Sequence, residues 1–147
     1  MLHAGARVAL AATLALSLAC GSDSATGPDN PGTPVGDYSL TTFNGKAPPV
    51  MVLSDTNYSV VLQSASLSLT TDGHYRSIAT IIETVLNHPS TYVDTATGTW
   101  LQGTSAGSLV LTDAFDGSKT NATWSGKTLT ATQSGDGLTA TFVYTRK

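Results

Sequence analysis

The chain has 147 residues and a net charge of −3, from 10 Asp and Glu against 7 Lys and Arg. This acidic balance argues against a nucleic-acid partner, because binding to a phosphate backbone requires a basic face. The single cysteine excludes an intramolecular disulfide.

Residues 1–19 are typical of a secretory signal peptide. Arg7 precedes an uncharged run from Val8 to Ala19. That run is shorter than the roughly 20 residues that a membrane-spanning helix needs. The small residues Ser17 and Ala19 also satisfy an ordinary signal peptidase. We therefore expect export and removal of residues 1–19, which takes Arg7 away and leaves a net charge of −4.

The segment Ser17-Leu18-Ala19-Cys20 resembles the lipobox of bacterial lipoproteins, although Ser17 stands where the lipobox usually has Leu. The resemblance implies that Cys20 is the mature N-terminus and carries diacylglycerol and further acyl chains such as palmitate. An unpaired thiol is a hazard in an oxidising compartment, and acylation removes it. A soluble exported protein with a free thiol is the alternative.

If Cys20 is acylated, the protein is a lipid-anchored resident of the bacterial cell envelope. More than one acyl chain is needed for stable anchoring. Gly21, instead of Asp, follows the cysteine, and in well-studied lipoproteins this is the default for the outer membrane, facing the periplasm or the surface. We expect the lipid to be the only membrane attachment, because the sequence has no second long apolar run.

Residues 20–35 are expected to form a disordered tether. From Gly21 to Val35 the sequence reads GSDSATGPDNPGTPV, with three prolines, three glycines and no aromatic residue. Such a segment cannot bury enough apolar surface to offset its chain entropy. Fully extended, it reaches about 50 Å.

Residues 36–147 are expected to form one all-β domain. Short turn dipeptides separate segments rich in Thr, Ser and Val, and such short turns join antiparallel strands. The dipeptides are Asn44-Gly45, Asp72-Gly73, Asp116-Gly117, Asp136-Gly137 and, as a weaker signal, Ser125-Gly126. The strands predicted between them are 37–43, 57–63, 65–71, 74–87, 91–102, 107–113, 119–125, 127–133 and 138–146.

Several of these strands alternate between apolar and polar residues, as in Leu67 and Leu69 between Ser and Thr, which indicates a sheet with one wet face. Residues 78–88 differ, because their apolar residues follow helical spacing. Their many β-branched residues favour a long strand. A short helix that covers a barrel end is the alternative.

Eight or nine consecutive hairpin-joined strands must hide their edges, so we predict an antiparallel meander that closes into a small up-and-down β-barrel. A two-sheet β-sandwich is the alternative. The stretch GDYSLTTFNG resembles the opening strand of lipocalin-like, calycin-type domains, where a Gly-x-Trp motif starts the barrel. Gly36 matches, and Tyr38 replaces Trp. The resemblance implies that Arg146 packs over Tyr38 and that the interior can hold a ligand.

The segment Gly103-Thr104-Ser105-Ala106-Gly107 has the letters of a nucleophile elbow. That motif works only at a turn from a parallel strand into a helix. Here strand-like runs flank it on both sides, so we predict a hairpin loop and no catalytic residue.

We expect no metal and no cofactor. A metal site needs three or four converging ligands, and the loose candidates Asp72, His74, His88 and Asp94 lack the spacing of a ligand signature. The run from Asp113 to Gly117 lacks the remaining acidic positions of a calcium loop and is expected to be a hairpin turn.

Aromatic residues occur on most of the predicted strands. Candidates for lining an interior cavity are Tyr58, Tyr75, Trp100, Trp124, Phe142 and Tyr144, although they can equally form a filled core. An eight-stranded barrel either fills with side chains or holds one small ligand. We therefore expect a non-catalytic lipoprotein that binds a small apolar ligand, or a structural lipoprotein with a filled barrel that contacts another envelope protein.

Overall fold

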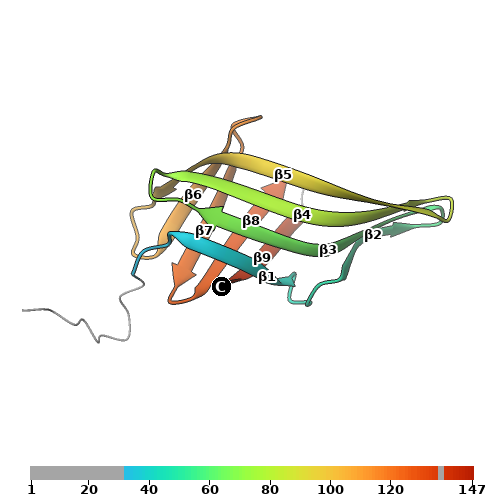
Figure 1. Cartoon of the computed structure of the whole chain (residues 1–147), viewed down its shortest axis with the longest axis horizontal. Helices are drawn as coiled ribbons and strands as arrows, with labels where there is room; N and C mark the ends of the chain where they lie inside the picture. Colours follow the sequence, from blue (N-terminus) through green and yellow to red (C-terminus); the bar gives the residue numbers. More distant parts are fainter. Residues whose placement is uncertain (1–31, 136–137) are drawn as a thin grey trace, which may run out of the picture.

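The structure is a computed structural model that describes residues 32–135 and 138–147. The predicted signal peptide, Cys20, most of the predicted tether and the Asp136-Gly137 dipeptide lie outside the described residues. Nine strands account for the regular structure (Figure 1): β1 (Gly36–Phe43), β2 (Val50–Asp55), β3 (Tyr58–Leu69), β4 (His74–Val85), β5 (His88–Gln102), β6 (Ser108–Asp113), β7 (Lys119–Ser125), β8 (Thr128–Gly135) and β9 (Leu138–Arg146). Over the described ranges, no helix is long and apolar enough to cross a membrane.

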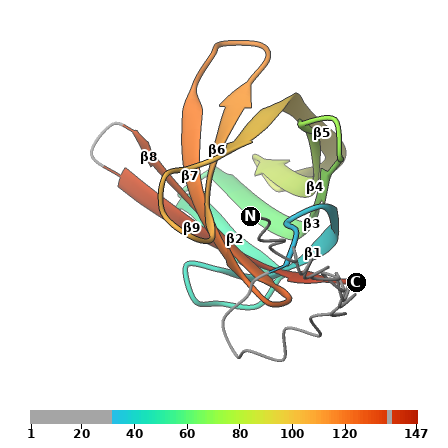
Figure 2. The same ribbon diagram turned by 90° about the vertical axis from the view of Figure 1, so that its left-hand side faces the viewer.

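The nine strands form one antiparallel sheet in the order β1-β9-β8-β7-β6-β5-β4-β3-β2. The first four residues of β1 also pair with β3, from Gly36 opposite Leu69 to Ser39 opposite Ser66. This pairing closes eight strands into a ring, seen from one end in Figure 2. β2 remains outside the ring, because it pairs with β3 alone. The predicted up-and-down barrel is confirmed, and the sandwich alternative is wrong because a single sheet closes on itself.

The division into strands differs from the prediction in two places, and several strand ends differ by a few residues, such as β5, which begins at His88 and not at 91. β3 is one strand where two were expected, because a bulge between Leu62 and Ser64 shifts the alternation of its side chains without ending the strand. β2 was not expected at all. Its own bulge between Met51 and Leu53, together with exposure on most of its length, removes the alternation that marks a half-buried strand.

The segment 78–88 is a strand up to Val85, and the helical alternative is wrong. Leu86 and Asn87 form a tight turn with φ of 49° and 66°, and the chain pairs back from His88. The helical spacing arises because this strand carries apolar residues on both faces. Ile81 lies on the inner face with the cavity, and its neighbour Ile82 lies on the opposite one.

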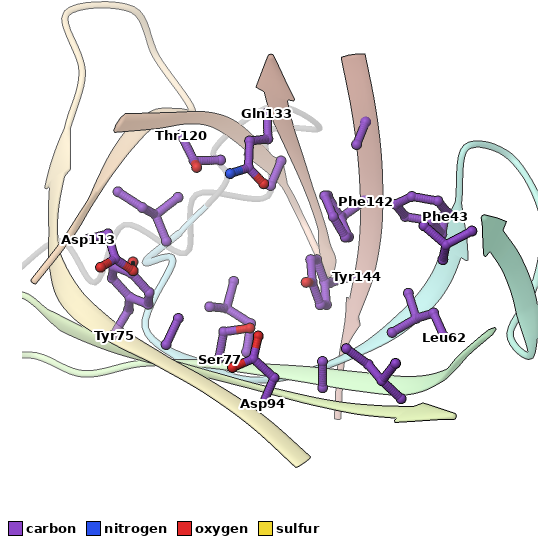
Figure 3. Close-up of a pocket in the computed structure, with 18 of the residues that line it drawn as sticks. Phe43, Leu62, Tyr75, Ser77, Asp94, Asp113, Thr120, Gln133, Phe142 and Tyr144 are labelled. Atoms are coloured by element: carbon purple, nitrogen blue, oxygen red, sulfur yellow. Dashed lines mark hydrogen bonds between the residues drawn. The ribbon is translucent and has the colours of Figure 1, made fainter. Parts of the chain in front are cut away.

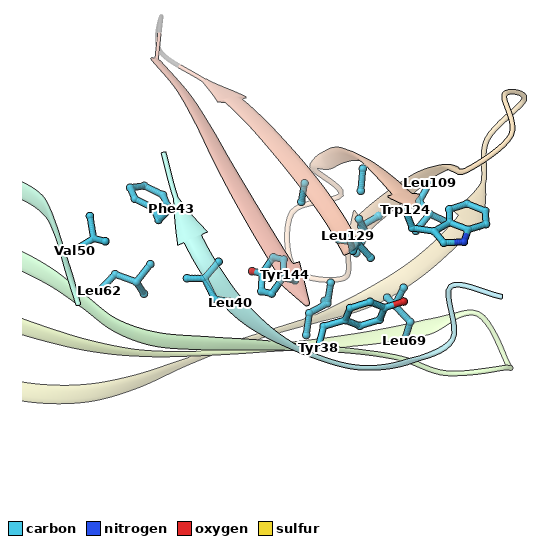
Figure 4. Close-up of a cluster of buried hydrophobic side chains, with 14 residues drawn as sticks. Tyr38, Leu40, Phe43, Val50, Leu62, Leu69, Leu109, Trp124, Leu129 and Tyr144 are labelled. Carbon is cyan, nitrogen blue, oxygen red and sulfur yellow. The ribbon is translucent and has the colours of Figure 1, made fainter. Parts of the chain in front are cut away.

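One end of the barrel, the closed end, is filled with side chains. The four largest fully buried side chains are Tyr38, Leu69, Leu109 and Leu129. Figure 4 shows them beside Trp124, where β1 begins and β3 ends. Thr33 and Pro34 are also bound here through their carbonyl groups. The contacts of the domain therefore begin before the expected start at Gly36.

At the opposite end, the open end, part of the sheet continues past the ring. This extension consists of β2 with residues 58–62 of β3, 81–85 of β4 and 88–92 of β5, and it projects to the right in Figure 1. One row of paired residues crosses it on the inner face, in the order Val50, Leu62, Ile81 and Tyr92. The barrel therefore has one sealed end and one end with a long apolar ledge.

Candidate ligand-binding cavity

A cavity of about 480 Å³ occupies the open end of the barrel. Its volume lies in the range of small-molecule sites, roughly 300 to 1,000 Å³. The strands β1 and β3 to β9 all contribute inward-facing side chains, and Val52 of β2 lies at the edge. The larger apolar lining residues are Phe43, Val60, Leu62, Leu67, Ile81, Leu111, Phe142 and Tyr144, and the polar ones are Tyr75, Ser77, Asp94, Asp113, Ser118, Thr120 and Gln133.

The two kinds of lining residue occupy different parts of the cavity (Figure 3). Phe43, Leu62 and Phe142 lie together toward the extension, whereas Tyr75, Asp113, Thr120 and Gln133 lie on the side away from it. Phe43 and Phe142 pack edge to face with ring centroids 5.0 Å apart, and Phe142 stacks on Tyr144 at 6.4 Å. The aromatic group therefore forms one rigid wall of the apolar part.

A hydrogen bond across two strand spacings defines the polar part. The Tyr75 hydroxyl on β4 donates to Asp113 Oδ2 on β6 at 3.3 Å. Gly98 on β5 lies between them in the register, opposite both residues. A Cβ atom at Gly98 would lie 2.7 Å from the Tyr75 ring. The glycine is therefore the reason that the tyrosine can lie across β5 and reach the carboxylate.

Burial raises the pKa of two tyrosines that line the cavity. Burial, with the Asp113 carboxylate as a second cause, raises the pKa of Tyr75 to about 12. Burial also raises the pKa of Tyr144 to about 12. Both phenols therefore keep their protons at any physiological pH and present O–H groups to the cavity.

A second hollow of about 390 Å³, here called the side chamber, adjoins the cavity. It lies where β5 and β6 diverge, because β6 pairs with β5 only from Gly98 onward. The two hollows share Asp94, Ala96, Asp113, Ser118 and Gln133, and the side chamber is completed by Thr95, Thr97, Phe115 and Asp116. The polar part of the cavity is thus continuous with a more polar chamber.

The six aromatic residues expected to line a cavity lie in three different places. Tyr75, Phe142 and Tyr144 line it. Trp100 and Trp124 are at the closed end, where the Trp100 indole N–H donates to the Thr70 carbonyl at 3.1 Å and Trp124 is buried in the core. Tyr58 is opposite Val85 at the tip of the extension. The sequence did not show which end of the barrel each aromatic residue occupies, because consecutive antiparallel strands run in opposite directions along the barrel.

Other lining residues were not expected as cavity residues. Phe43 and Leu62 are core-like in sequence, and Asp94, Asp113 and Gln133 are isolated polar residues. The sequence did contain a signal for the two aspartates. Asp94 lies within a β-rich segment and Asp113 at the end of another, in strands whose other polar positions are mostly Thr or Ser.

At the closed end, Arg146 lies against Tyr38, the two residues that the resemblance pairs. The guanidinium carbon is 5.2 Å from the centroid of the Tyr38 ring. Arg146 Nη2 donates to the Tyr38 hydroxyl at 2.7 Å and also to the Thr33 carbonyl. The hydroxyl in turn donates to the Pro34 carbonyl at 2.6 Å. This cluster ties the entry and exit of the barrel together.

The remaining candidates for chemistry are dispersed. Ser105 lies in an exposed loop between the antiparallel strands β5 and β6, as expected of a hairpin loop. His74 and His88 lie at opposite ends of the β4–β5 hairpin. Asp113 and Asp116 accept backbone N–H groups within the β6–β7 turn. In the described part of the chain, no group of three or more His, Cys, Asp and Glu is arranged to hold a metal ion.

The fold and the cavity together define the class: an eight-stranded up-and-down β-barrel protein with one sealed end and one open, mainly apolar pocket. Comparison of the chain with protein-family models, with curated proteins and with solved structures gives no match.

Proposed function

We propose that the protein is a non-catalytic binding protein that holds a small hydrophobic ligand in the open end of its barrel. The observation that carries the proposal is the asymmetry of the interior, which is filled at the closed end and hollow at the open end. A core without a ligand role would be filled along its whole length, because protein interiors pack like organic crystals.

The extension supports this function by lengthening the apolar floor of the site. Leu62 and Ile81 line the cavity and also belong to the row that crosses the extension. A ligand that lies along this row removes apolar surface of its own and of the protein from water. Such burial is worth about 25 cal/mol per Å² of apolar surface.

The proposal is tested by thermal unfolding of the protein with a panel of uncharged apolar compounds, including the fluorophore N-phenyl-1-naphthylamine. At a hundredfold excess over Kd, a ligand stabilises the folded state by about 2.7 kcal/mol and raises Tm by roughly 10 °C. A panel that leaves Tm unchanged would contradict the proposal.

A matched pair of variants locates the site. Ala79→Phe fills the cavity from β4 and should abolish the increase in Tm. Thr80→Phe places the same ring on the next residue, on the opposite face of the strand, and should retain it. Equal responses of the two variants would place the ligand elsewhere.

We further propose that the domain is lipocalin-like and is held at the cell envelope, at the outer membrane, by a lipid on Cys20. The lipobox-like segment supports the anchor, and the closed barrel with Arg146 on Tyr38 supports the resemblance.

The described chain begins at the closed end (Figure 1), so an anchor upstream leaves the open end accessible. The test is incorporation of labelled palmitate by the full chain in a bacterium, which should be lost in Cys20→Ser. Equal labelling of both would refute the anchor.

A second candidate function, contact with another envelope protein, is favoured by the surface of the extension. Met51, Leu53, Leu86 and Val93 are all more than half exposed. Within the described residues, positions 88–96 of β5 pair only with β4, and the free edge ends at Thr97, whose carbonyl accepts the Ala114 N–H at 2.9 Å. Val93 lies on this edge, whereas Met51 and Leu53 lie on β2 at the other edge of the extension. An unpaired edge that carries an exposed apolar residue can accept an extended segment of a partner. The filled barrel expected for this function is found only at the closed end.

This candidate is tested by a photo-crosslinking amino acid at Val93 in cells, with Asp37 at the closed end as control. A discrete adduct formed only from position 93 is expected. Identical adducts from both positions would overturn it.

A further inference from the structure

The charges that line the two hollows all have the same sign. Asp94 and Asp113 border both the cavity and the side chamber, and Asp116 borders the side chamber. Among the described residues that line either hollow there is no Lys, Arg or His. Lys119 follows Ser118 in the chain, but it pairs with Thr112, whose neighbours Leu111 and Asp113 face inward, so Lys119 lies on the outer face.

The carboxylates are positioned by the fold and remain available to a ligand. Asp113 Oδ1 accepts the Phe115 backbone N–H at 2.7 Å, and its Oδ2 accepts the Tyr75 hydroxyl. Asp116 Oδ1 accepts the Ser118 N–H at 2.8 Å, and this hydrogen bond holds the pKa of Asp116 below its ordinary value. Each carboxylate has further lone pairs for a donor from a ligand.

An exposed aromatic ring completes the side chamber. Phe115 is 98% exposed, although it lies between the two aspartates of the β6–β7 turn. An aromatic face beside carboxylates is suited to a cation, because the negative face of the ring and the carboxylates attract the same charge. A fatty acid would instead bring a carboxylate into repulsion with three others.

We propose that the ligand is an amphiphile with a cationic head group: its apolar body lies in the cavity, and its head lies in the side chamber among Asp94, Asp113 and Asp116. This inference rests on the proposed function, since it names the class of ligand for the same cavity. The apolar part selects the alkyl or ring portion, and the side chamber selects the sign of the head group.

The experiment compares three ligands with the same alkyl chain, namely dodecyltrimethylammonium, dodecanol and dodecanoate, below their micelle concentrations. Displacement of N-phenyl-1-naphthylamine from the protein gives their relative affinities. We expect the cation to bind about tenfold more tightly than dodecanoate, with dodecanol between them. Equal or tighter binding of dodecanoate would overturn the inference and leave the proposed function standing.

Variants separate the side chamber from the overall negative charge of the protein. Asp94→Asn with Asp113→Asn should reduce the preference for the cation over dodecanoate to less than about threefold. Asp37→Asn removes a charge at the closed end and should leave the preference unchanged. A preference that survives the double substitution would refute the assignment to the side chamber. If the fluorophore does not bind and none of the three ligands changes Tm, the proposed function itself fails.

Discussion

Tyr75 on β4 and Asp113 on β6 are joined by a hydrogen bond that passes over a strand with no side chain at the crossing point. The three residues Tyr75, Gly98 and Asp113 form one row across three strands. This row forms the polar end of the cavity. Gly98 is as necessary for the hydrogen bond as Tyr75 and Asp113 are, because a side chain at position 98 would occupy the space of the Tyr75 ring.

Substitution of Gly98 by alanine should destabilise the barrel. The added Cβ would lie 2.0 Å from the Thr112 carbonyl oxygen and 2.7 Å from the Tyr75 ring, so both β6 and the tyrosine would have to move. We expect a loss of about 3 kcal/mol in the free energy of unfolding, measured by urea denaturation. The neighbouring exposed Thr99→Ala should change it by less than about 0.5 kcal/mol. Wild-type stability of Gly98→Ala would contradict the close approach.

The stability of the protein should fall between pH 10 and pH 12. Tyr75 and Tyr144 both have a pKa of about 12 in the folded state against an ordinary value of 10.0. Above pH 10 the unfolded chain therefore binds fewer protons than the folded one, and the free energy of unfolding decreases with pH. Well below pH 10 both states hold these protons and the contribution is constant. Urea denaturation from pH 8 to pH 12 measures this profile.

The same profile identifies the tyrosines responsible. Tyr75→Phe with Tyr144→Phe should make the decrease above pH 10 shallower, because the variant lacks the two phenols whose pKa is raised to about 12 in the folded state. The absorbance of tyrosinate provides an independent titration. A decrease of equal slope in the double variant would refute the assignment.

Tyr38→Phe should weaken the closed end. The hydroxyl accepts a hydrogen bond from Arg146 and donates one to Pro34, and Tyr38 has no solvent exposure. Its removal leaves the Pro34 carbonyl and one guanidinium N–H without this partner, at a cost of about 1 to 3 kcal/mol in the free energy of unfolding. Tyr92→Phe, at an exposed position on the extension, is the control, and equal stability of the two variants would show that the cluster contributes nothing.

Leu86→Gly should stabilise the protein. Leu86 has a φ of 49° at the tip of the extension and is 61% exposed. A side chain is unfavourable in this conformation, and glycine removes about 1 kcal/mol of strain. Leu86→Ala keeps the strained backbone and should alter the unfolding free energy much less. If Leu86→Gly is less stable than the wild type, contacts of the leucine outweigh the strain.

The sequence by itself determined the class of fold, because the relevant signals are local. Turn dipeptides and the alternation of residues such as Leu67 and Leu69 specify antiparallel strands with one buried face. The strand around Ile81 and Ile82 was harder to predict from the sequence, because both of its faces are apolar and the resulting spacing resembles that of a helix. β2 was missed for a different reason: its bulge and its exposure leave no alternating face.

Only the tertiary structure decided which side chains share a compartment. Trp100 and Tyr75 are both aromatic and inward-facing, yet closure of the barrel places one at the closed end and the other in the cavity. Asp94 and Asp113 line the same hollow because β5 and β6 diverge on the N-terminal side of Gly98, and no spacing along the chain encodes that divergence. The sequence specifies the strands through local patterns. The cavity and its charge depend on the register of the strands and on the unequal lengths of neighbouring strands, such as β5 and β6.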